Sequence, residues 1–72
     1  MNTEKLLRIV ALELSTDLTK LELELETTIN SDTMDIPNKT LKIKNLIGRI
    51  VQTEASIMKF NQMMAPPENN EK

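Results

Sequence analysis

Apolar residues recur along the first thirty positions of the chain at alternating steps of four and three. The row consists of Leu7, Ala11, Leu14, Leu18, Leu21 and Leu25. On a helix this spacing places the side chains on one stripe, the pattern of a helix that packs lengthwise against another helix. No glycine or proline interrupts Thr3 to Ile29, and leucine and glutamate, both good helix formers, dominate this segment. The pattern therefore predicts a helix over residues 3–29, capped by Asn2 or Thr3.

A strand over residues 21–28 is the competing interpretation of the same segment. Leucine and glutamate alternate there with period two, as they would in a half-buried strand. Leu21 and Leu25, however, continue the row that begins upstream, and glutamate is a poor strand residue. The helix is the favoured interpretation.

Residues 30–36 are rich in asparagine, serine, aspartate and threonine, which predicts a turn. Asp35 can cap a second helix, with Pro37 in its first turn, where a missing N–H costs nothing. We expect this helix to span residues 37–64 and to gather on one face Ile43, Leu46, Ile47, Ile50, Ile57, Met58 and Met64. Ala65-Pro66-Pro67 ends the helix, since proline disfavours helix in the residue before it. We expect residues 66–72 to form a disordered tail.

Two helices of similar length joined by a short turn predict an all-α fold, an antiparallel two-helix hairpin over residues 1–65 with coiled-coil-like packing. Residues 1–30 carry three basic and six acidic side chains, whereas residues 36–64 carry five basic and one acidic. Folding brings Glu22, Glu24 and Glu26 beside the basic residues that follow the turn, Lys39, Lys42, Lys44 and Arg49. Exposed ion pairs contribute only about 0.2–1 kcal/mol each, but together they specify the pairing direction.

The chain has 72 residues and forms one small domain at most. A domain of this size buries only about 60% of the surface that its unfolded chain exposes, and small scaffolds usually add a disulfide, a metal or a partner. The sequence has no cysteine and no histidine, so disulfides and the usual zinc sites are excluded. We therefore expect no cofactor or metal, and a hairpin that completes a larger helical bundle with a partner or a second copy.

Composition argues against several other classes of function. A net charge of −2 and a single aromatic residue, Phe60, are not typical of a nucleic-acid-binding protein. No apolar run approaches the roughly 20 residues that span a bilayer, and Glu4, Lys5 and Arg8 interrupt any secretory signal. We expect the mature protein to be the chain as written, soluble and cytoplasmic. Without a nucleophile–base pair or a phosphate-binding loop, we do not expect an enzyme.

A second row lies nearly opposite the first on residues 3–29 and is our first candidate for a partner-binding surface. It consists of Ile9, Leu12, Thr16, Thr19 and Leu23. A helix with two such rows has more apolar surface than a single partner helix covers. Scattered leucine and isoleucine are also normal on protein surfaces, which is the alternative interpretation.

The second candidate is the cluster Met58, Phe60, Met63 and Met64, in which we expect Phe60 and Met63 to point away from the main apolar face. Methionine adapts to irregular partner surfaces, although this last turn can instead fold over the open end of the hairpin. A shoulder widens the apolar face enough for contact with two neighbouring helices; it consists of Ile47, Val51, Ala55 and Met58.

Two single residues stand out in the second helix. Glu54 falls inside the apolar arc, between Ile50 and Ile57. Either it lies at the edge of the arc and reaches solvent or a lysine, or it is a specificity device for a partner, as buried polar residues can be. Gly48 falls on the polar side, where it marks a close approach or simple tolerance.

The length, the hairpin, the lack of cysteine and the stretch from Ile47 to Phe60 resemble the small co-chaperones of type III secretion needle subunits. The local similarity is the segment Thr53-Glu54-Ala55-Ser56-Ile57. The resemblance implies a cytoplasmic hairpin that binds a helical-repeat chaperone. Together the two would keep a needle subunit monomeric before export, and the second row would be the docking surface.

The alternative is a hairpin that associates with itself into a four-helix-bundle dimer, like the plasmid copy-number regulator that binds RNA. Its RNA function does not transfer, because the first helix is acidic here and its charges neutralise the basic residues of the second. A structural role, or inhibition of a host protein by a phage-type hairpin, belongs to the same alternative.

Overall fold

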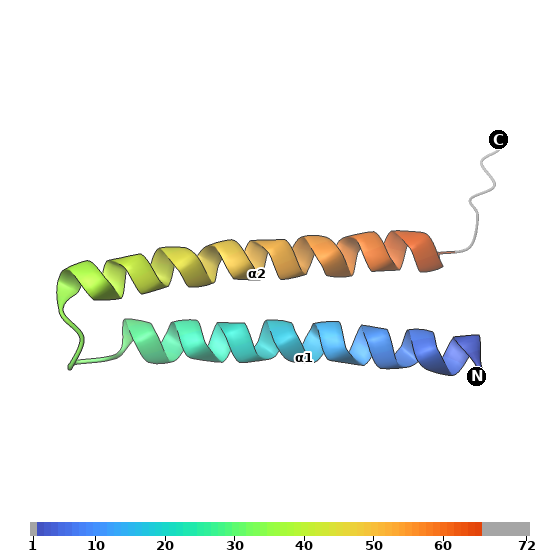
Figure 1. Cartoon of the computed structure of the whole chain (residues 1–72), viewed down its shortest axis with the longest axis horizontal. Coiled ribbons are helices and arrows are strands. Elements are labelled where there is room, and N and C mark those ends of the chain that lie inside the picture. The colour runs from blue at the N-terminus through green and yellow to red at the C-terminus, as the bar shows by residue number, and fades with distance from the viewer. Residues whose placement is uncertain (1, 66–72) are drawn as a thin grey trace.

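The computed structural model describes residues 2–65, which form two helices, α1 (Thr3–Ile29) and α2 (Ile36–Met64). The helices lie side by side and antiparallel, joined at one end by residues 30–35 (Figure 1). The fold is the expected all-α helical hairpin, and α2 begins one residue before the expected range. Residues 21–28 are helical, and residues 2–65 contain no strand. The tail expected at residues 66–72 lies outside the described residues.

Side-chain caps begin both helices, as the sequence indicates. The Asn2 side chain accepts hydrogen bonds from the backbone N–H of Glu4 and Lys5, at 2.9 and 3.3 Å. The Asp35 carboxylate accepts from the backbone N–H of Asn38 at 3.0 Å and from its side-chain amide at 2.7 Å. Each cap satisfies donors that have no partner within the first turn of the helix.

A single seam joins the two helices. It is lined on α1 by Leu7, Val10, Leu14, Leu18, Leu21, Leu25 and Thr28, and on α2 by Lys39, Ile43, Leu46, Ile50, Thr53, Ile57 and Phe60, all buried or half-buried. The α2 set follows steps of four and three throughout, as in an antiparallel coiled coil. Leu46, with 2% of its surface exposed, and Leu21, with 8%, are the buried apolar residues of the described chain. The core is therefore one side chain deep.

The seam differs from the expected rows at several positions. Ala11 is exposed and Val10 is half-buried in its place. Positions 10 and 11 flank the line through Leu7 and Leu14, and valine has more apolar surface to bury than alanine. On α2 the expected face is too wide, because three of its members are exposed: Ile47, Met58 and Met64.

Two threonines and one lysine occupy seam positions without leaving polar atoms unpaired. The buried Thr28 hydroxyl donates to the Glu24 carbonyl at 2.8 Å, and the half-buried Thr53 hydroxyl donates to the Arg49 carbonyl at 2.9 Å. Lys39 reaches out of the seam to the turn, where its Nζ donates to the Ser31 carbonyl at 2.9 Å. Because each group is satisfied, these residues limit the apolar burial but leave no buried polar group unpaired.

Gly48 sits in open space, so the close approach considered for it is not present. A methyl group added at its Cα would meet no atom within 4 Å. We expect Gly48→Ala to raise the free energy of unfolding by about 0.5–1 kcal/mol, because glycine loses more backbone entropy in a helix. Urea unfolding followed by circular dichroism measures the change. The exposed Ala55→Gly in the same helix is the matched control and should lower stability by a similar amount. A destabilised Gly48→Ala protein would contradict the open environment.

Hydrogen bonds from the Asn38 backbone N–H and side-chain amide lower the pKa of Asp35. A carboxylate with a folded-state pKa below its unfolded value stabilises the fold above the unfolded pKa, near pH 4, and loses this contribution as pH falls through the folded pKa. We expect Asp35→Asn, which keeps a capping oxygen, to be less stable than the wild type at pH 7. The two melting temperatures should approach each other as the pH falls from about 4 through the lower folded-state pKa of Asp35. A difference that does not change with pH would contradict this assignment.

Candidate protein-binding surfaces

The first candidate surface lies on the side of α1 that faces away from α2, and we call it the outer row: Ile9, Leu12, Thr16, Thr19 and Leu23. All five residues are exposed, Leu12 to 67% and Leu23 to 57%. They lie about half a helical turn from the seam leucines, so α2 does not cover them. The Thr19 hydroxyl donates to the Ser15 carbonyl at 3.1 Å, which leaves its methyl group to the surface.

The second surface is one side of α2, which we call the apolar flank. Its apolar members are Ile47, Val51 and Met58, and all three are exposed. Each follows a seam residue by one position, which places all three on the same side of the helix. Ala55, the remaining member of the expected shoulder, is exposed four positions after Val51 and lines a groove with Gln52 and Ser56. The expected shoulder therefore reaches the edge of this groove.

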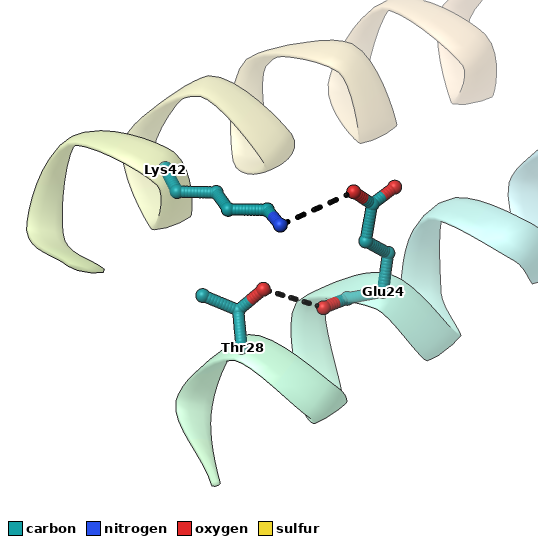
Figure 2. A network of polar contacts seen from close by, with 3 residues as sticks. All are labelled: Glu24, Thr28 and Lys42. Carbon is teal, nitrogen blue, oxygen red and sulfur yellow. Dashed lines mark hydrogen bonds and ion pairs between the residues drawn. The ribbon is translucent and has the colours of Figure 1, made fainter. Parts of the chain in front are cut away.

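The other side of the hairpin is polar, and we call it the polar flank. A shallow groove between the helices there is lined by Asp17, Lys20, Leu21, Glu24, Arg49, Gln52 and Thr53. Figure 2 shows Lys42 reaching from α2 to Glu24 on α1, with 3.5 Å between Lys42 Nζ and Glu24 Oε2. About half of each side chain is exposed, 43% and 48%, so this pair contributes little stability.

The expected set of charge pairs is therefore reduced to one within residues 2–65. Glu22 and Glu26 lie two positions from Glu24, and residues two apart project from nearly opposite sides of a helix. Of the basic residues expected to face them, Lys39 bonds instead to the Ser31 carbonyl. α1 carries more acidic residues and α2 more basic ones, so the two helices attract each other. This attraction does not take the form of a row of ion pairs between them.

The expectation that Phe60 points away from the apolar face is wrong. Phe60 is half-buried and continues the seam three residues after Ile57. It also lies along a shallow groove with Leu14 and Met63. Met63 is 64% exposed, as expected, and Met58 belongs to the apolar flank. The cluster is thus split, with Phe60 closing the open end of the hairpin.

Three exposed apolar residues near the turn were not singled out from the sequence as surface candidates. Ile29, Ile36 and Leu41 are exposed, and Leu41 lines a groove with Met34 and Asn38. For Leu41 the available signal was its phase, since it lies two positions from both Lys39 and Ile43. Ile36 follows the seam spacing, three positions before Lys39, and is nevertheless exposed at the first position of α2.

Glu54 is exposed beside the seam and has no ion-pair partner within residues 2–65. Its neighbours three and four positions away along α2 are Ile50, Val51, Ile57 and Met58, all apolar. A single carboxylate thus lies in the middle of an apolar surface, with no lysine of α2 within one turn of it.

Residues 2–65 contain no cluster of acidic, histidine or cysteine side chains suited to a metal ion. In the same part of the chain, neither helix combines the length and the apolar character that crossing a membrane requires. Comparison with protein-family models, curated proteins and solved structures finds no match to this chain. The functional interpretation therefore rests on the outer row and the apolar flank themselves.

The new position of Phe60 can be tested against its neighbour Met63. We expect Phe60→Ala to lower the free energy of unfolding by about 2 kcal/mol, less than for a fully buried phenylalanine, because the ring is half-buried. Met63→Ala should change it by less than about 0.5 kcal/mol, as is usual for exposed positions. Thermal and urea unfolding measure both. Equal effects of the two substitutions would contradict the placement of Phe60 in the seam.

Proposed function

We propose that this protein is not an enzyme and acts by binding another helical protein through the outer row of α1. The observation that supports the proposal is the exposure of Leu12 and Leu23 on the side of α1 that α2 does not cover. Burying one leucine side chain is worth about 1.5–3 kcal/mol, so covering both favours association. The outer row has the spacing that a second helix requires, because its residues recur at steps of three and four.

The composition of the outer row indicates the kind of contact. Thr16 and Thr19 separate Leu12 from Leu23, so the row is apolar at both ends and mixed in the middle. Obligate interfaces are more uniformly apolar than this, whereas exchangeable interfaces resemble the rest of the protein surface. The row therefore suits a partner that binds and dissociates.

In its most specific form, the proposal makes this chain a cytoplasmic co-chaperone of a type III secretion needle subunit. Its support is the resemblance in length, hairpin architecture and lack of cysteine, together with the segment of residues 53–57. The outer row would dock on a helical-repeat chaperone, since stacked helical repeats form extended concave surfaces that accept a helix. The two proteins together would hold the needle subunit monomeric until its export.

The proposal can be tested by capture of partners on the tagged full-length chain. We expect nuclease-treated extracts of its native cells to yield a helical-repeat chaperone together with a small helical export subunit, identified by mass spectrometry. Leu12→Asp/Leu23→Asp should reduce recovery at least about tenfold, because charged groups would be buried without partners. Circular dichroism should show unchanged helix content, since both residues are exposed.

Ser56→Asp is the control for an introduced carboxylate, because it places one aspartate at an exposed position of α2 outside both candidate surfaces. It should bind as the wild type does. Wild-type protein that recovers no chaperone would contradict the secretion role. Recovery that is unaffected by Leu12→Asp/Leu23→Asp would contradict the assignment of the outer row.

A further inference from the structure

α2 carries a second heptad row beside its seam, and the row includes the apolar flank. It consists of Thr40, Lys44, Ile47, Val51, Glu54 and Met58, at alternating steps of four and three. All six residues are exposed in the hairpin. The row is about 27 Å long at 1.5 Å per residue, and its spacing is that of a helix packed lengthwise against another. α1 occupies the first row of α2, so this second row has no helix against it within residues 2–65.

The order of side chains at the centre of this row is self-complementary. Reading along α2, a basic residue is followed by two apolar residues and then by an acidic one: Lys44, Ile47, Val51 and Glu54. Read in reverse, the same four positions run from acidic to basic. Glu54 is the one acidic residue between positions 36 and 64, so its place at the end of this set is what makes the pattern complementary to itself.

We propose that a second copy of this chain docks on the second row, with the two α2 helices antiparallel. In an antiparallel heptad pairing centred between Ile47 and Val51, each Ile47 lies beside Val51 of the second copy. The same register places each Glu54 beside Lys44 of the second copy, and two-fold symmetry repeats both contacts. The result is a four-helix bundle in which the turns of the two hairpins lie at opposite ends.

Charge selects this occupant and this direction. A parallel copy would bring Lys44 against Lys44 and Glu54 against Glu54, which is unfavourable. The antiparallel copy instead gives Glu54 a basic partner, which no lysine or arginine within residues 2–65 of its own chain supplies. The pairing uses α2 and leaves the outer row of α1 uncovered, so it does not depend on the proposed function.

Sedimentation equilibrium on the full chain tests the pairing. The wild type should sediment at twice the chain mass of 8.2 kDa at micromolar to hundreds of micromolar concentrations. Val51→Asp should weaken the dimer by about 100-fold or more, because it buries an unpaired charge at the centre of the row. Leu12→Asp is the matched control on the outer row and should leave the dimer unchanged.

The charges are tested by exchange. Glu54→Lys and Lys44→Glu should each weaken the dimer by about tenfold or more, since like charges then face each other. The double variant Lys44→Glu/Glu54→Lys should restore the wild-type dissociation constant to within about threefold, since opposite charges face each other again. Helix content measured on every variant separates loss of pairing from loss of folding.

The register is tested by cross-linking, which the cysteine-free sequence permits. A mixture of Ile47→Cys and Val51→Cys chains should form a disulfide between the two variants on oxidation, in preference to disulfides within either variant. A wild-type monomer at hundreds of micromolar, a dimer indifferent to Val51→Asp, or a double charge variant as weak as the single ones would each overturn the proposal. The proposed function is contradicted by a different result, a wild-type chain that dimerises but captures no partner protein.

Discussion

The apolar seam between α1 and α2 is the interaction on which the rest of this structure depends. Two helices can bury only the stripe that each turns toward the other, and here that stripe leaves Leu21 and Leu46 as the buried apolar side chains of residues 2–65. With so shallow a core, every other apolar residue stays near solvent. The hairpin is thus ordered like a folded domain. It nevertheless exposes apolar surface that a larger domain would bury in its core.

The rest of the surface differs in polarity from one side of the hairpin to the other. The polar flank holds the groove with charges of both signs, where Lys42 meets Glu24. The apolar flank of α2 and the outer row of α1 together carry six of the twelve exposed large apolar side chains of residues 2–65. The two apolar surfaces belong to different helices and face different directions. One molecule therefore has room for both proposed contacts at once, a second copy of the chain on α2 and another protein on α1.

The sequence was sufficient to predict both helices from the spacing of their apolar residues, the caps from Asn2 and Asp35, and the antiparallel pairing from the short turn, because these depend on local chemistry and on periodicity. It was not sufficient where neighbouring positions compete for the seam. Val10 replaces Ala11 because burial favours the larger of two side chains that flank the same line, and the choice depends on the rotation of the helix about its axis. Phe60 enters the seam because it continues the spacing three residues after Ile57. The charge pairs were overestimated for a related reason, since Glu22 and Glu26 face away from the side that Glu24 shares with Lys42.

The tie between Lys39 and Ser31 has a consequence for how the chain folds. This hydrogen bond links α2 to the turn, next to the Asp35 cap. At this end of the hairpin, residues that pair between the helices are closest in sequence. Contacts between residues near in sequence form with the smallest loss of chain entropy, so we expect pairing of the helices to begin there and to spread toward Leu7 and Phe60. We therefore expect the parts of α1 and α2 near Leu7 and Phe60 to pair last and to open first, with faster amide exchange there than beside Leu21 and Leu46.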